Sequence, residues 1–343
     1  PYEVKLLLNS LIQQKLITLD ELNHRITSFD YGFSDEHNKP SIIGEADLKN
    51  LGTPLRQSAA QMWCLLRLLP VLVGDLVPTD NQEWQLLLLL LMCMEILFSP
   101  SVTPAATRYL SEIIEEHHAL FMELFSQALR PEHHSMIHYP RAIRMLGPLI
   151  HLWVMRFEAK RVFCKRLGHI TCNFRNICKT MAYRHQLMQC YSFMCGSVFS
   201  QNTEVGPGYT TLLANLDCFK EIQCGLTGIP LFTELYVPVM VTVKDATYRP
   251  GMTVFMSNDQ DGEPQFGLIK VLLVLEQTVK LVVQRWETLG FEKHFFAYRV
   301  LQTKDLLAID VKELLDHHPL HAVQSYSDDD DDTMYISLRY RHF

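Results

Sequence analysis

The sequence predicts an α+β protein in which a mostly helical N-terminal region is followed by a small β-barrel-like domain. Two observations lead to this fold class: apolar side chains recur at helical spacing through much of residues 2–195, and short β-branched runs prevail after residue 231. With 343 residues, 48% of them hydrophobic, the chain can bury substantial cores and has room for about two to three domains.

The N-terminal residues predict a pair of helices. Apolar positions at helical spacing mark residues 2–16, and Thr18 followed by Glu21 has the form of a capping box that opens a second short helix. Residues 30–54 are rich in Gly, Asn, Asp, Ser and Pro, a composition typical of a long surface loop or covering segment.

Two apolar helices are expected next. The first covers residues 55–77 and should bend at Pro70, because proline removes a hydrogen-bond donor and clashes with the preceding turn. The second covers residues 81–98, where Asp80 and Glu83 supply the start signal.

The strongest helical pattern covers residues 104–129. Thr103 is a good N-cap, Pro104 suits the first helical position, and an apolar stripe follows. After it the pattern predicts a broken helix and then two further helices, at residues 133–146, 149–167 and 173–195.

The last third of the chain changes character. Five short β-branched runs predict strands at residues 235–243, 252–256, 266–275, 278–285 and 294–301. A brief helix is expected at 305–316, and the tail with five consecutive aspartates at 328–332 should be solvated and disordered up to about Tyr335. We expect five divisions: a helical region at 1–148, two terminal helices at 149–200, a linker at 201–230, a β domain at 231–303, and a short helix with an acidic tail at 304–343.

Positive charge is concentrated in residues 130–185, although the whole chain has a net charge of −7. This stretch holds eleven Arg or Lys against two carboxylates, Glu132 and Glu158. Such arrays neutralise phosphate backbones, so the sequence predicts nucleic-acid contacts. The binding residues we expect are Arg156, Lys160, Arg161, Lys165, Arg166, Arg175 and Lys179. The aromatic residues among them are interpreted as the buried sides of the same helices rather than as platforms for stacking bases, and they are Phe157, Phe163, Phe174 and Tyr183.

Glu158 lies among these cations and has two readings. An ion pair with Arg161, three residues on, would explain it as a surface feature. A role as a metal ligand would need further carboxylates, because two Mg²⁺ ions in a nuclease centre are held about 3.5–4 Å apart by several of them.

The sequence carries few signals for other kinds of site, such as nucleotide-binding, hydrolase or zinc sites. It contains no P-loop, no G-x-G-x-x-G motif and no G-x-S-x-G motif. The spacing of the nine cysteines matches neither a secreted disulfide scaffold nor a zinc finger, which favours an intracellular, reducing compartment. No secretory signal is read, and the most apolar run, residues 86–94, is shorter than the ~20 residues of a membrane span, so we expect no membrane partner.

A set of local motifs resembles the C-terminal half of CACTA-type transposases, encoded by transposons in fish and invertebrate genomes. The matching residues are His133-His134-Ser-Met-Ile-His138-Tyr139-Pro140, Gly147-Pro148-Leu, Trp153-Val-Met-Arg156-Phe157-Glu158-Ala-Lys160, Lys165, Asn173-Phe174-Arg-Asn176 and Ala182-Tyr-Arg184-His185-Gln186. The resemblance covers most of residues 1–195, and the β-rich segment more loosely resembles the small barrel that follows in related elements.

This resemblance implies an RNase H-like nuclease core bearing two Asp and one Glu, with a helical insertion between the second Asp and the Glu. Glu158 matches the Glu, which would make it a catalytic residue and metal ligand. Residues 1–145 would be largely the insertion, and the helices from 149 onward would be the end of an incomplete RNase H-like core. Mg²⁺ is expected only if the full core is present, and otherwise no cofactor.

The sequence departs from the family at its start. The family's second Asp lies in an Asp-x-x-His motif just upstream of a segment like residues 2–6, so both catalytic Asp residues are expected to be missing. The leading hypothesis is therefore a nuclear, transposase-derived, DNA-associated protein or fragment without catalysis. One alternative is a non-enzymatic scaffold that recruits protein partners through the helical region and the β domain. Another is a metal-dependent nuclease, if further carboxylates approach Glu158.

Overall fold

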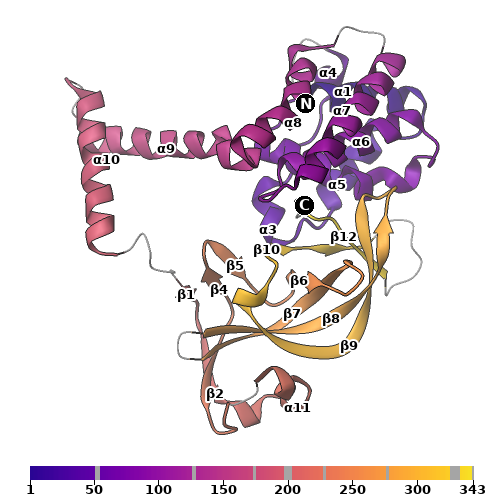
Figure 1. The fold of residues 1–343 in the computed structure, drawn as a ribbon. Coiled ribbons are helices and arrows are strands. Elements are labelled where there is room, and N and C mark those ends of the chain that lie inside the picture. Colours follow the sequence, from indigo (N-terminus) through magenta and orange to yellow (C-terminus); the bar gives the residue numbers. More distant parts are fainter. Residues whose placement is uncertain are drawn as a thin grey trace.

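A computed structural model describes residues 1–50, 55–125, 129–172, 175–196, 203–226, 229–275, 278–324 and 333–341. The side chains of residues 155–160, 221 and 223–224 lie outside this description. Helices occupy the N-terminal half and antiparallel sheets the C-terminal half, which confirms the α+β class (Figure 1).

The helical region covers residues 1–152 and is followed by two further helices. Among the described residues its α-helices are α1 (Tyr2–Gln13), α2 (Leu19–Ser28), α3 (Gly32–Asp35), α4 (Glu45–Lys49), α5 (Ala59–Val73), α6 (Gln82–Leu97), α7 (Pro104–Leu124) and α8 (Pro131–Leu146). Short 3-10 turns are η1 (Glu36–Asn38), η2 (Gly74–Leu76) and η3 (Leu149–Leu152). The helices that follow are α9 (Val154–Thr171) and α10 (Ile177–Met194).

Side-chain caps fix where several of these helices begin. Thr18 Oγ1 accepts a hydrogen bond from the backbone N–H of Glu21 at 3.1 Å, and Thr103 Oγ1 accepts one from Ala106 at 3.2 Å, as the sequence predicted. The cap of α6 is Asn81 rather than the predicted Asp80, because Asn81 Oδ1 accepts the Trp84 N–H at 2.9 Å.

The segment predicted as a long loop, 30–54, contains α3, η1 and α4, with residues 51–54 outside the described part. Leu48 of α4 and Ile43 before it are buried in the helical core, so this segment covers that core as a packed element. The proline in the next helix, Pro70, lies inside α5, which ends at Val73 and passes into η2.

The centre of the helical region is formed by α5 and α6. Trp84 of α6 is fully buried, together with Leu65, Leu69 and Leu72 of α5. Among the described residues one stretch, Ala59–Leu76, has the length and apolar character of a membrane span, and 67% of it is buried inside the protein.

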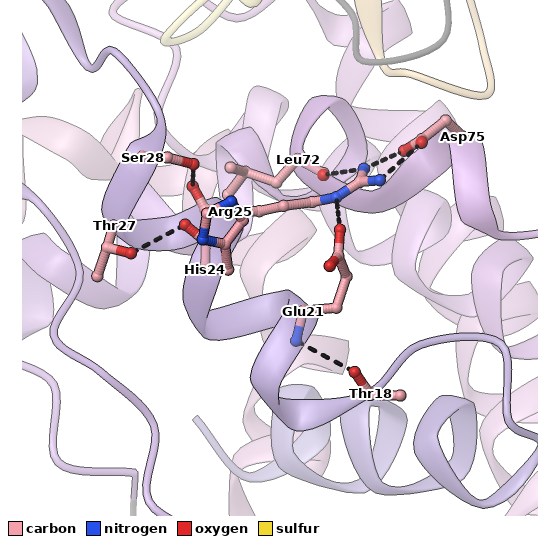
Figure 2. Close-up of polar contacts among 8 residues, drawn as sticks. All are labelled: Thr18, Glu21, His24, Arg25, Thr27, Ser28, Leu72 and Asp75. Atoms are coloured by element: carbon pink, nitrogen blue, oxygen red, sulfur yellow. Dashed lines mark hydrogen bonds and ion pairs between the residues drawn. The ribbon is translucent and has the colours of Figure 1, made fainter.

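A buried ion pair connects α2 with the end of α5 (Figure 2). The guanidinium of Arg25 forms bonds to both carboxylate oxygens of Asp75, at 2.5 and 3.0 Å, and donates to the Leu72 carbonyl at 2.9 Å. Arg25 Nε also donates to Glu21 at 2.7 Å, so the carboxylate predicted to complete a capping box is paired with Arg25 instead. Acceptors from three elements, α2, α5 and η2, thus hold one buried cation.

The C-terminal half begins earlier than predicted. Its strands are β1 (Thr203–Val205), β2 (Gly208–Leu212), β3 (Glu234–Pro238), β4 (Val241–Val243), β5 (Ala246–Tyr248), β6 (Thr253–Asn258), β7 (Pro264–Leu275), β8 (Thr278–Glu292), β9 (Ala297–Asp310), β10 (Asp316–Leu320), β11 (Ala322–Val323) and β12 (Thr333–Ile336). Short helical pieces are η4 (Leu213–Asn215), α11 (Phe219–Ile222), η5 (Gln223–Leu226) and η6 (Val311–Glu313).

The strands form a three-stranded sheet, β1-β4-β5, and a larger antiparallel sheet with the path β10-β6-β7-β8-β9-β12-β11, to which β2 and β3 are added beside β7. The first and last strands of this path, β10 and β11, are separated along the chain by His321 alone, so the two ends of the path are neighbours in the chain. Phe266 and Trp286 are buried on its inner side, in one cluster with Ile336. The closed small β-barrel stays a prediction.

Two expectations for this half are wrong. The described part of the predicted linker, 203–226, contains β1, β2 and α11, and its Leu213 and Ile222 are buried against the sheet. The predicted helix at 305–316 is instead the end of β9, the 3-10 turn η6 and the start of β10, because β9 pairs with β8 as far as Asp310 opposite Lys280. Non-local strand pairing overrides the local helical pattern here.

Part of the C-terminal tail forms a strand. Residues 328–332 lie outside the described part, but β12 directly after them pairs with β9, with Tyr335 opposite Arg299. The predicted ordering near Tyr335 is therefore confirmed, and it begins at Thr333.

The helical and β regions share one hydrophobic core. Phe296, Val323 and Tyr335 belong to the same buried cluster as the core of α5 and α6. Trp84 Nε1 donates to the His294 carbonyl at 3.1 Å, and His294 Nε2 lies 2.8 Å from the Gly74 carbonyl. The two regions are thus packed together through buried contacts, rather than joined only by a chain.

Ion pairs from the C-terminal residues Arg339 and Arg341 link the end of the chain to the helical region. Asp35 pairs with Arg67 of α5 and, at 3.2 Å, with Arg339, while Arg341 Nε donates to Glu95 of α6 at 3.0 Å. The Arg341 guanidinium also lies 4.2 Å from the centre of the Phe291 ring.

Glu95 should make stability depend on pH. Burial raises its pKa to about 7, although Arg341 opposes the shift. The folded state therefore holds this proton more tightly than the unfolded chain, so the stabilisation is present below about pH 4.5 and is lost as the pH rises to about 7. Unfolding by denaturant should show wild-type stability falling by about 2 kcal/mol across this window relative to Glu95→Gln.

His317 also makes the stability of the folded protein depend on pH, so the effect of Glu95 is measured as the difference between wild type and Glu95→Gln. Burial lowers the pKa of His317, which gives a slope of opposite sign near its ordinary value of 6.5. This slope is common to wild type and Glu95→Gln and cancels in their difference. Parallel stability profiles for the two proteins would contradict the assignment to Glu95.

Candidate nucleic-acid interface

The helices α9 and α10, residues 154–194, project from the helical region, and we refer to them as the arm (Figure 1). Its base is fixed by Trp153, whose ring stacks on Phe98 at 5.1 Å between centroids, while the Trp63 ring meets Trp153 edge-on at 6.1 Å. The arm therefore starts from an aromatic anchor at the end of α6.

The corner between the two helices depends on close packing. Cys172 at the end of α9 has a left-handed conformation with φ 46°, which turns the chain toward α10. Gly168 is buried, and a Cβ placed on it would lie 3.2 Å from Met181 and 3.5 Å from Ile177 of α10. The small residue allows α10 to pass close to α9.

Charge on the arm has one sign over a long stretch. Residues 159–203 contain seven Lys or Arg and no Asp or Glu. Five of the predicted binding residues have described side chains, and all are exposed: Arg161, Lys165, Arg166, Arg175 and Lys179. None of the ion pairs found between described residues involves them. These cations are open to solvent.

Three predicted site residues cannot be placed beyond their backbone. Arg156, Glu158 and Lys160 lie in α9, but their side chains are outside the described residues. The catalytic and metal-binding role of Glu158 therefore stays a prediction. Among the described residues no cluster of three or more His, Cys, Asp and Glu is arranged to hold a metal ion.

A groove of about 750 Å³ runs between the two helices. Phe163 and Leu167 of α9 line one side. The α10 side consists of two parallel rows at four-residue spacing, Lys179-Tyr183-Leu187 and Thr180-Arg184-Met188. Each row contains one cation among less polar side chains.

The exposure of aromatic residues differs from the expectation. Phe163 is half-buried, but Tyr183 is 64% exposed, and α10 has no buried residue among those described. The sequence analysis predicted no groove; the cations Lys179 and Arg184 beside Tyr183 on one helix are the signal that would have indicated it. Phe157 and Phe174 lie outside the described side chains.

A second polar cluster, not predicted from the sequence, is buried in the helical region. Glu3 of α1 lies 2.8 Å from His117 Nε2 of α7 and 3.0 Å from His133 Nε2 of α8. Burial alone would raise the pKa of Glu3, but the hydrogen bonds with the two histidines outweigh it and lower the pKa to about 2. The cluster ties three helices together.

Beside this cluster lies a pocket of about 410 Å³. Trp63, Phe98 and Trp153 form its aromatic side, and Arg130 and Glu132 are at its polar end. The aromatic rings already contact one another as the anchor of the arm, which gives the pocket a structural role at the base of α9.

Comparisons with known proteins add no family assignment: no protein-family model, no curated protein and no solved structure matches this chain.

Proposed function

We propose that this chain is a transposase-derived, DNA-associated protein or fragment that binds the phosphate backbone through the arm. The observation that favours this function is the run of exposed cations on α9 and α10 in a stretch of 45 residues, 159–203, without a carboxylate. Phosphates would neutralise these charges and release condensed counterions.

The proposed origin rests on the motif resemblance. By this resemblance, α9 and α10 would be the terminal helices of an RNase H-like core, and Glu158 would be the third catalytic acid. The β region would correspond to the small barrel that follows the core in the family. We propose DNA binding without catalysis, because one carboxylate cannot hold the two Mg²⁺ ions of a nuclease centre and no partner for Glu158 is identified, and Mg²⁺ only where a full core is present. A nuclear location belongs to the same proposal.

A protein-interaction scaffold is the second candidate. The observation favouring it is the set of exposed apolar side chains on the arm, including Val162, Ile170, Tyr191 and Met194, the last 88% exposed. Such surfaces commonly meet proteins, and binding to them gains little from lowering the salt concentration.

The dependence of DNA affinity on salt separates the two candidates. Fluorescence anisotropy with the whole chain and a labelled duplex should show binding at about 50 mM salt. The logarithm of the affinity should fall linearly with the logarithm of salt, with a slope of about −4 to −5 if each of the five described cations contacts one phosphate. Absent binding at low salt, or a slope near zero, would contradict the proposed function.

A further inference from the structure

We propose that the groove between α9 and α10 receives unpaired bases, which makes single-stranded nucleic acid the preferred ligand of the arm. The inference rests on the proposed phosphate-binding function and specifies the class of nucleic acid. The groove differs in character from the other exposed cations of the arm, because most of its lining is aromatic or aliphatic, and Lys179 belongs to both.

The position of Tyr183 is the first argument. This side chain is 64% exposed and yet lines a groove, between Lys179 one turn before it and Leu187 one turn after it. A phenol ring that is largely exposed and lines a groove is a surface on which a planar base can stack.

Positive charge lies on both rows of α10 around that ring. Lys179 lies in the same row as Tyr183, and Arg184 lies in the neighbouring row. A base stacked on Tyr183 would have its flanking phosphates within reach of a cation from each row. Alternating aromatic and cationic groups of this kind are typical of proteins that bind single strands without sequence preference.

The volume and openness of the groove suit single strands better than duplex. A cavity of about 750 Å³ can hold several stacked bases, whereas the bases of a duplex are already stacked on each other and present only edges. A protein partner would have to supply carboxylates for Lys179 and Arg184, because covering both cations desolvates them and residues 159–203 contain no carboxylate, whereas every nucleotide carries a phosphate.

Binding of a labelled oligothymidine and of a labelled duplex to the whole chain tests the inference. Tyr183→Leu should weaken oligothymidine binding about tenfold and change duplex binding less than about twofold, because only unpaired bases stack on the ring. Tyr183→Phe should bind like wild type. Tyr191→Leu is the matched control, since Tyr191 is 69% exposed on the same helix but does not line the groove.

Each other outcome overturns a defined part of the proposal. If Tyr183→Leu weakens the binding of oligothymidine and of duplex equally, base stacking on Tyr183 is ruled out, while the proposed phosphate binding still stands. If wild type binds neither nucleic acid at low salt, the proposed function fails and this inference with it. If instead an acidic amphipathic peptide binds in a Tyr183-dependent manner and oligothymidine does not, the groove is a protein-docking site. Circular dichroism of each variant confirms that α10 is retained.

Discussion

Asp75→Ala is expected to destabilise the folded protein by about 3–5 kcal/mol, because it leaves the Arg25 guanidinium buried without its main counter-charge. The side chains of Arg25 and Asp75 are only 8% and 9% exposed, and the remaining acceptors are the Leu72 carbonyl and the Glu21 carboxylate. Figure 2 shows that these groups converge on one guanidinium from α2 and the end of α5.

Chemical denaturation measures this effect, and two further variants make the result specific. Glu45→Ala breaks the exposed pair between Glu45 and Lys49, whose side chains are 70% and 73% exposed, and it should leave the unfolding midpoint unchanged. The double variant Arg25→Met with Asp75→Ala should recover much of the lost stability, because no unpaired charge is then buried. Equal effects of Asp75→Ala and Glu45→Ala would show that the buried pair does not hold α2 in place.

The helical half of the fold could be predicted from local patterns. The expected helix at 104–129 is α7, since the cap at Thr103, the proline at the first position and the apolar stripe all lie within a few residues of each other. Errors were small where two cap residues were adjacent, as with Asp80 and Asn81 at the start of α6. Such features are determined by neighbours in the chain.

The C-terminal half could be predicted only in part, because sheet pairing joins distant residues. Nothing local indicates that residues 305–310 extend β9 alongside β8, or that β12 returns to pair with β9. The contact between Arg339 and Asp35, and that between Arg341 and Glu95, likewise depend on how the two regions pack. The shared core therefore had no sequence signature.

The candidate site was predictable in its charge and not in its shape. The sequence placed Arg161, Lys165 and Lys179 on two successive helices, and their side chains are exposed there. It assigned Tyr183 to a buried face, since a helical stripe normally packs on a core. The arm projects instead, so the same residue lies in an open groove, and only the tertiary arrangement distinguishes the two situations.

Reversing the charge of the arm should weaken DNA binding by about 100-fold or more at low salt. The variant Arg161→Glu, Lys165→Glu, Arg175→Glu and Lys179→Glu replaces four exposed cations that have no described ion pair, and glutamate retains good helix propensity. Each lost phosphate contact lowers the salt slope by about one, so the slope should become shallower by about four.

The matched control reverses the same number of charges in the β region, at the exposed residues Arg285, Arg299 and Lys304 of the sheet and Lys312 of η6. The two variants have the same net charge, so a difference in their DNA affinities depends on where the charges lie and not on the net charge of the protein.

The most direct test of the proposed binding surface is the ratio of the dissociation constants of these two variants for one duplex at about 50 mM salt. Binding through the arm predicts a loss of about 100-fold or more for the arm variant, and less than about threefold for the sheet variant. Equal losses, or a larger loss for the sheet variant, would contradict the assignment of the phosphate-binding surface to α9 and α10.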